Sequence, residues 1–445
     1  MKYCTILLSL LVVHSYTLAA DPVLHERIKL LDEKGAEEDR LGVSIAVDNG
    51  LVVMGGFGSD INGNFSGIAH VFSAEAGMHV TKLLPEDGES GDALGGAVAI
   101  EGNTVVVGAT QDDDLGGSSG SVYVFEATGA LIHKLHASDG KGGDNFGSSV
   151  AIHHGMIAIG ASGASRGNGS STGAAYVFDA VTGHELAKFV PDETGHYGRF
   201  GVSIAIEDSI VVVGSSNNRA AYVFDWTAGV QLHKLESDED RLNHSWFGWS
   251  IAMESGLVAV GAFQDDDHGL GSGAVYVFDV ETGAQIHQIN SEDSDSYDQF
   301  GIDVDIDHGV LVVGSNADDD NGNASGSAYL FDIVTGEQLV KLRASDGGLG
   351  DSFGGDVAIG GDVIAIGASR DDDIEHDAGA GYVFDNLFVP CLPDLNGDGI
   401  LDSSDVSAFL AAFQAQDFAA DFVDDGRFNY FDISVFLQAF EAGCP

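Results

Sequence analysis

The sequence predicts an all-β protein, a seven-bladed β-propeller of four-stranded antiparallel blades, followed by a small α-helical domain. Two observations carry this prediction. A block of four short β-rich runs recurs seven times, once every 47 to 54 residues, and repeats of this size are typical of propeller blades. Near Pro390 the pattern changes into two helical stretches, each preceded by an acidic loop. We therefore expect a signal peptide over 1–20, the propeller over 21–388 and the small domain over 389–445.

The first 20 residues have the pattern of an export signal. Lys2 precedes an apolar run over 6–13, and Ala19 and Ala20 offer a small-residue cleavage site. The run is too short to span a bilayer, which favours a signal peptide over an anchor. We expect a protein secreted outside the cell or to its surface, without membrane insertion.

The charge balance excludes some partners. The 445 residues include 70 Asp and Glu against 18 Lys and Arg, for a formal net charge of −52. Nucleic acids recruit clusters of basic residues, so we expect no nucleic acid partner. Hydrophobic residues make up 44% of the chain, which is enough for a folded core despite the charge.

Each repeat opens with a dipeptide that ends in glycine. It is followed by an alternating run, a tight turn, an apolar run that ends in Gly, a polar loop, a run such as Val122–Phe125, a turn, and a fourth run such as Leu131–Leu135. Such runs between Gly and Asp turns are typical of short strands. The opening dipeptides are Leu41-Gly42, Leu94-Gly95, Phe146-Gly147, Phe200-Gly201, Phe247-Gly248, Phe300-Gly301 and Phe353-Gly354.

The two ends of the array complement each other. The seventh repeat stops after its third run, at 381–385, while a spare strand-like run at 27–31 precedes the first repeat. We expect this N-terminal strand to complete the last blade and close the ring, which removes an exposed sheet edge.

The Phe-Gly start, the Val-Val-Gly-Ala centre and the Tyr-Val-Phe third strand resemble the FG-GAP repeats of integrin α-subunit propellers and their bacterial relatives. The resemblance covers about residues 24 to 388 and implies the propeller fold. In integrins the calcium loops lie between strands one and two. Here that turn is only a few residues long, as at Glu101-Gly102-Asn103, so those calcium sites cannot be carried over.

Acidic residues lie instead in the loop between strands two and three. Hard carboxylate oxygens suit calcium, but Asp and Gly also suit exposed turns that bind nothing. Both interpretations stay open. The candidate ligands are Asp112, Asp114, Asp265, Asp267, Asp318, Asp320, Asp371 and Asp373.

The C-terminal domain contains a twelve-residue loop with calcium-ligand spacing. Alternating oxygens, a glycine for the sharp turn, a backbone carbonyl and a closing acid converge on one ion in such loops. The predicted ligands are Asp394, Asn396, Asp398, Ile400 through its carbonyl, Asp402 and Asp405. A calcium-free helical hairpin is the alternative.

A second, weaker loop follows over 421–432. It lacks an oxygen at its third position, where Val423 stands, so we expect weaker calcium binding or none. Its candidate ligands are Asp421, Asp425, Arg427 through its carbonyl, Asn429 and Asp432. After each loop, apolar residues at i, i+3, i+4 and i+7 predict a helix, with Val406, Phe409, Leu410 and Phe413 in the first and Ile433, Phe436, Leu437 and Phe440 in the second.

Two loop-helix units closed by Asp resemble dockerin modules, a calcium-dependent variant of the EF-hand. The resemblance implies Ca²⁺ as cofactor and attachment through a cohesin-like partner or a surface receptor. Cys391 and Cys444 bracket this domain. In an oxidising compartment they most simply form a disulfide, with two free thiols as the alternative.

Three functions remain open. The first is a non-catalytic recognition or adhesion protein that binds an extracellular protein or polysaccharide on its propeller face. The second is a component of polysaccharide degradation, either a carbohydrate-binding accessory or a glycoside hydrolase, in which Trp226, Trp246 and Trp249 could stack on sugars. The third is a surface or matrix protein cross-linked by calcium. No catalytic signature appears in the sequence, so we expect a protein that is not an enzyme.

Overall fold

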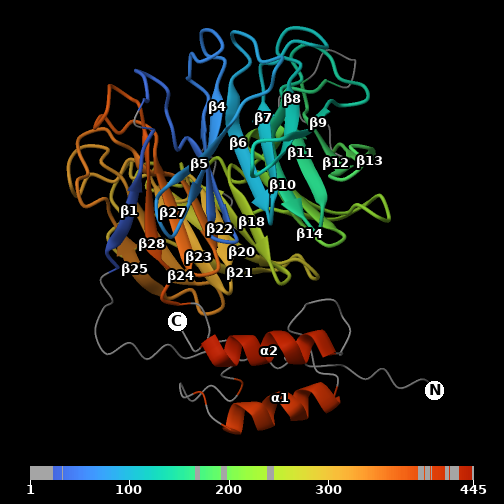
Figure 1. The fold of residues 1–445 in the computed structure, drawn as a ribbon, viewed down its shortest axis with the longest axis vertical. Helices are drawn as coiled ribbons and strands as arrows, with labels where there is room; N and C mark the ends of the chain where they lie inside the picture. The colour runs from blue at the N-terminus through green and yellow to red at the C-terminus, as the bar shows by residue number, and fades with distance from the viewer. Residues whose placement is uncertain are drawn as a thin grey trace. The chain divides into compact units, whose positions relative to one another are not determined.

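The computed structural model describes residues 24–32, 34–165, 171–191, 198–237, 245–388, 395, 401, 403–415, 420 and 430–442. The chain divides into two compact units, one of Pro22–Asn386 and one that contains the C-terminal residues from Leu387. The first unit consists of seven four-stranded antiparallel sheets (Figure 1), which confirms the predicted seven-bladed propeller.

The blades follow one another along the chain. Blades 1 to 3 contain β2 (Ser44–Asp48), β3 (Leu51–Gly56), β4 (Ile68–Ser73) and β5 (His79–Leu83); β6 (Leu94–Glu101), β7 (Thr104–Ala109), β8 (Ser121–Glu126) and β9 (Leu131–Leu135); and β10 (Phe146–His153), β11 (Met156–Ala161), β12 (Ala174–Asp179) and β13 (Glu185–Phe189). Blades 4 and 5 contain β14 (Phe200–Glu207), β15 (Ile210–Ser215), β16 (Ala220–Asp225) and β17 (Val230–Leu235), with a short 3₁₀ turn η1 (Ser216–Asn218), and then β18 (Ile251–Glu254), β19 (Leu257–Ala262), β20 (Ala274–Asp279) and β21 (Gln285–Ile289). Blade 6 contains β22 (Val304–Asp307), β23 (Val310–Ser315), β24 (Ser327–Asp332) and β25 (Gln338–Leu342), and blade 7 contains β26 (Phe353–Gly360), β27 (Val363–Ala368), β28 (Ala380–Asp385) and β1 (Glu26–Leu30).

The N-terminal strand closes the ring. β1 pairs antiparallel with β28, with Lys29 opposite Tyr382 and Leu30 opposite Gly381, and Figure 1 shows the blue β1 beside the orange strands of blade 7. It starts one residue earlier than the predicted 27–31. The innermost strands contact one another from blade to blade, and β26 contacts β2. Every blade is therefore complete, as the sequence predicts.

The repeated Phe-Gly dipeptide has a packing reason. Its Phe packs edge-to-face against the third strand of its own blade, as Phe353 does against Tyr382 at 5.3 Å between ring centroids. Its Gly has a positive φ, and its carbonyl lies against the Gly that ends the second strand of the preceding blade. A Cβ on Gly314 would lie 2.1 Å from the carbonyl oxygen of Gly354. Both glycines are required because the blades approach each other backbone to backbone.

The inner strands of all seven blades surround a central cavity of about 660 Å³. Outside it, the core consists of apolar side chains packed between neighbouring blades, for example those of β6 to β8 against β3 and β4.

The C-terminal unit contains two helices, α1 (Ser403–Ala415) and α2 (Tyr430–Ala442), drawn in red in Figure 1. Phe409 and Phe436 stack face to face with ring centroids 4.0 Å apart. Leu410 and Leu437, which the sequence places on the same apolar faces, are instead half-exposed. Each directly follows a buried Phe, and one residue along an α-helix is a rotation of about 100°. No helix in the described part of the chain is long and apolar enough to cross a membrane.

Candidate functional site

One face of the propeller gathers the loops between strands two and three and the crossovers between blades. We call this face the rim. The crossover after blade 2 lies against a loop of the same blade, where the Gly143 N–H donates to the Gly117 carbonyl at 2.9 Å. The up-and-down strand order puts these segments at the same end of each sheet, so the acidic residues of both come together.

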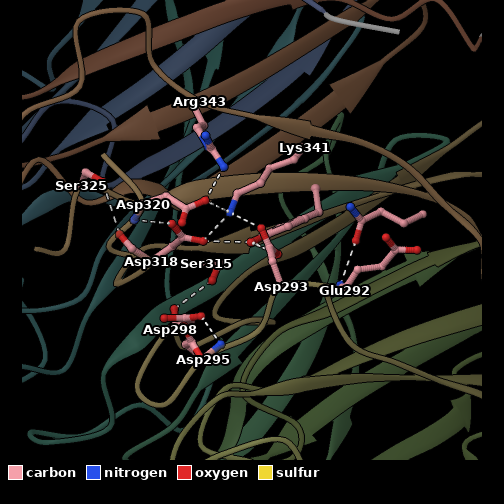
Figure 2. Close-up of polar contacts among 12 residues, drawn as sticks. Glu292, Asp293, Asp295, Asp298, Ser315, Asp318, Asp320, Ser325, Lys341 and Arg343 are labelled. Carbon is pink, nitrogen blue, oxygen red and sulfur yellow. Dashed lines mark hydrogen bonds and ion pairs between the residues drawn. The ribbon is translucent and has the colours of Figure 1, made fainter. Parts of the chain in front are cut away.

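Blade 6 has the most complete acidic cluster (Figure 2). Asp318 and Asp320 come from the loop after β23, and Asp293 comes from the crossover before the blade. The ammonium group of Lys341, from β25, lies 2.7 Å from Asp293, 2.8 Å from Asp318 and 2.7 Å from Asp320. The hydroxyl of Tyr329 donates to Asp318 at 2.9 Å. Lys341 therefore occupies the centre of three carboxylates.

The same arrangement recurs in blades 2 and 7. In blade 2 the central group is Lys134, with Tyr123 beside it, and in blade 7 it is Lys29 of the N-terminal strand, with Tyr382 beside it. The carboxylates around these two lysines are Asp87, Asp112 and Asp114 in blade 2 and Asp346, Asp371 and Asp373 in blade 7.

Blade 5 has an amide in the lysine position. The Nε2 atom of Gln288 donates to Asp267 at 2.8 Å, and the Tyr276 hydroxyl donates to Asp265 at 2.9 Å. Blade 3 has no aspartate triplet, and there Lys188 contacts Asp139 at 2.6 Å. The aspartates at each candidate position are thus brought together within a blade.

The lysines set the electrostatics of the rim. Burial alone would lower the pKa of Lys341, but hydrogen bonds to three aspartates outweigh it and raise the pKa. Burial would raise the pKa of Asp318, yet the hydrogen bond from Lys341 holds it below its usual value. In blade 2 the hydrogen bond from Lys134 likewise lowers the pKa of Asp114. These carboxylates remain ionised around a permanent positive charge.

In blades 2, 6 and 7 a calcium ion would have to displace the ammonium group, since both require the same oxygens. Calcium binding by the rim therefore stays a prediction, and the lysine ammonium groups would compete with the ion for the carboxylates.

The lysines were not predicted from the sequence, although the sequence contains a pattern that marks them. A Lys at the last but one position of the fourth strand recurs in six blades, at 29, 82, 134, 188, 234 and 341.

The tyrosine hydroxyls contribute to the same clusters. Tyr329→Phe removes the single hydroxyl that lies 2.9 Å from the Asp318 carboxylate and 3.0 Å from that of Asp293. We expect this variant to be less stable by about 2 kcal/mol, the usual value for hydrogen bonds to charged groups. Urea unfolding measures it, with Tyr297→Phe, an exposed rim tyrosine, as the control. Equal stability of the two variants would contradict a structural role for the Tyr329 hydroxyl.

Most of the predicted C-terminal ligands fall outside the described residues. These are Asp394, Asn396, Asp398, Ile400, Asp402, Asp421, Asp425, Arg427 and Asn429, together with the cysteines Cys391 and Cys444. Asp432 lies in α2, but its side chain is outside the described part. Asp405, the predicted closing ligand of the first loop, lies in the first turn of α1 and is fully buried.

A second acidic group, unexpected from the sequence, lines the central cavity. Asp303 accepts a hydrogen bond from the Val357 N–H at 2.8 Å, Asp305 from the Ile359 N–H at 2.8 Å, and Asp356 from the Ile45 N–H at 2.6 Å. Each carboxylate thereby bridges the inner strands of two blades.

Their surroundings raise the pKa values of these three carboxyl groups. Burial raises the pKa of Asp303 to about 7 and that of Asp305 to about 8. Burial, with the charge of Asp303 nearby, also raises the pKa of Asp356. Among the described residues that line the cavity there is no lysine, in contrast to the rim.

Comparison with known proteins identifies the repeats. The model of a family described as FG-GAP repeat matches residues 78–125, 131–178, 230–278, 284–331 and 337–384, together more than half of the chain. Each match starts at the fourth strand of one blade and ends at the third strand of the next. No curated protein matches the chain.

Proposed function

The chain belongs to the FG-GAP repeat family, and we propose that it is a secreted, non-catalytic recognition or adhesion protein that binds an extracellular protein or polysaccharide on its rim. One observation carries the proposal. Large apolar side chains stand exposed among the carboxylates of the rim loops and crossovers, including Leu349 at 76% and Leu270 at 56% exposure. Apolar anchors surrounded by polar groups are typical of interaction surfaces.

The lysine-contacted carboxylates of the rim have a structural role in this proposal. Hydrogen bonds from lysines lower the pKa of Asp114 and Asp318, and these side chains hold the loops in place, so that the exposed side chains form a fixed surface. A glycoside hydrolase requires a carboxylic acid with a raised pKa beside a carboxylate. Burial raises the pKa of the rim residue Asp298 to about 6, so the hydrolase alternative is tested directly, by release of reducing sugar.

The C-terminal unit supplies the attachment in this proposal. Asp405 lies buried in the first turn of α1, and in this proposal it closes a Ca²⁺ site formed by the 394–405 loop. Leu410 and Leu437, at equivalent positions of α1 and α2, are exposed and are available to a cohesin-like partner or a surface receptor. Export depends on the signal peptide over 1–20.

Carbohydrate binding within polysaccharide degradation is the second candidate, and one feature favours it. Trp249 contacts Trp246 and Phe263 at centroid distances of 5.5 and 5.2 Å, and Arg199 lies over the Trp246 ring. This aromatic cluster lies on the rim, near the short η1 loop of blade 4. Trp226 is not part of it, because its Nε1 donates to the Asp208 carbonyl at the other end of the strands.

Replacing rim anchors tests the proposal. We expect a variant with Leu115, Leu270, Leu349 and Ile374 changed to Ser to lose binding to immobilised extracellular proteins and polysaccharides that retain the parent chain. The matched control changes four exposed side chains of the outer strands, Leu131, Leu186, Leu232 and Ile286, to Ser. Loss of binding only in the control would contradict recognition by the rim.

The same assay separates the other candidates. If the parent chain binds polysaccharides but not proteins, and Trp246→Ala alone loses that binding, the result favours a carbohydrate-binding accessory. Release of reducing sugar favours an enzyme. Self-association of the parent that requires calcium favours a cross-linked matrix protein.

A further inference from the structure

The face of the propeller opposite the rim is formed by tight turns between the first and second strands. Two neighbouring turns bring two imidazoles and a carboxylate together. His153 and His154 lie at the turn between β10 and β11 in blade 3, and Asp208 lies at the equivalent turn of blade 4. The Nε2 of His153 is 3.6 Å and the Nδ1 of His154 is 3.3 Å from the Asp208 Oδ1, and all three ligand atoms lie within 4.8 Å of one another.

These separations suit a first-row transition-metal ion. Ligands about 2.0–2.1 Å from a tetrahedral zinc ion lie roughly 3.4 Å from each other, close to the two distances from Asp208. Imidazole nitrogen with one carboxylate oxygen is a donor set for zinc, copper or nickel, while calcium prefers oxygen alone. Three protein ligands leave one tetrahedral position open.

The backbones that carry the ligands are held in place from outside the cluster. The Glu101 carboxylate of blade 2 accepts hydrogen bonds from the backbone N–H groups of His154 and Gly155. The Trp226 Nε1 donates to the Asp208 carbonyl at 2.7 Å. Such supporting contacts orient metal ligands and raise affinity.

The site is accessible to solvent. His154 is 60% and Asp208 76% exposed at the side chain, so an ion could enter without any change of fold. The net charge of −52 also concentrates divalent cations near the surface. The turn of blade 6 offers a comparison, since His308 there contacts the neighbouring Asp307 at 2.8 Å but has Asp307 where blade 3 has a second histidine.

We propose that His153, His154 and Asp208 form a binding site for a zinc-class transition-metal ion, with one coordination position open to an external ligand. This site shares no residue with the predicted calcium loops over 394–405 and 421–432 or with the acidic clusters of the rim. It does not depend on the identity of the ligand that the rim binds.

Titration of the full chain, freed of metal by a chelator, with Zn²⁺ in a calorimeter and with Co²⁺ in a spectrophotometer tests the proposal. We expect saturable binding and visible Co²⁺ absorption bands of a low-symmetry four-coordinate site. His154→Asn and Asp208→Asn remove a ligand but keep a residue that tolerates the positive φ of these turns, +48° and +49°. Each should weaken Zn²⁺ binding about tenfold or more, and His153→Gln with His154→Asn should abolish the Co²⁺ bands.

The control is His308→Asn, at an equivalent turn with a φ of +52°. It should leave both titrations unchanged, and circular dichroism should show the same fold in every variant. Zn²⁺ affinity and Co²⁺ bands that persist in the double variant would overturn the proposal, as would their loss in His308→Asn alone.

Discussion

Lys341→Met is expected to lower the free energy of unfolding of the propeller by about 3 kcal/mol, the usual cost of removing one partner from a buried ion pair. The Lys341 side chain is only 12% and that of Asp318 only 4% exposed. Without the ammonium group, the buried carboxylate of Asp318 would face those of Asp293 and Asp320 without its nearest cation. Urea unfolding of the full chain, followed by fluorescence, measures the loss.

Lys188→Met is the matched control. In the described part of the chain Lys188 forms an ion pair with one carboxylate, that of Asp139, and both side chains are more exposed, so its removal should cost less than about 1 kcal/mol. Equal losses in the two variants would contradict the view that Lys341 is a buried cation that holds the blade 6 carboxylates together.

Calcium should rescue Lys341→Met in part. The three freed carboxylates are hard oxygen ligands close enough to share an ion. Millimolar calcium should therefore raise the melting temperature of the variant more than that of the parent. The same rise in both proteins would show that calcium acts elsewhere.

Raising the pH from about 5 to about 9 is expected to destabilise the propeller through the carboxylates of the central cavity. The folded-state pKa is about 8 for Asp305 and about 7 for Asp303, well above the value near 3.8 expected in the unfolded chain. The folded state therefore binds more protons across this interval, and its stability falls as pH rises through these pKa values.

Asp305→Asn isolates this effect. Asparagine keeps a carbonyl oxygen for the Ile359 N–H but cannot ionise. We expect it to be more stable than the parent by about 2 kcal/mol at pH 9, a value reduced because Asp305 keeps contact with the cavity, and to show no gain at pH 4. Thermal unfolding across pH measures the difference, with Asp113→Asn, exposed on the rim, as the control. A gain that is independent of pH would contradict ionisation as the cause.

Much of the fold could be predicted because one motif recurs seven times. A Phe-Gly dipeptide alone says little, but its repetition with four strand-like runs specifies blades, and the missing strand of the last repeat specifies closure by β1. The register of Lys29 opposite Tyr382 then completes the blade 7 cluster, which links closure of the ring to the chemistry of the rim.

The sites were harder to predict because they combine residues distant in sequence. The aspartates were visible as runs in single loops, whereas Lys341 lies 21 residues from Asp320 and 48 from Asp293, and only the strand register shows that they meet. In the sequence, Asp305 has the pattern of an ordinary polar position in an alternating strand. Its burial could not be predicted from that pattern, because it arises only when seven blades close around a cavity. Asp208 meets His153 and His154 only through the contact between blades 3 and 4.

Calorimetric titration of calcium into the full chain and into its Asp394→Ala, Asp398→Ala variant tests most directly whether lysines, rather than calcium, hold the recognition face of the propeller. We predict saturable binding by the parent and no binding of comparable affinity by the variant, because the first C-terminal loop binds the calcium and ammonium groups occupy the clusters of blades 2, 6 and 7. Several equivalents of calcium bound by the variant would contradict this and would make the rim a metal-dependent surface.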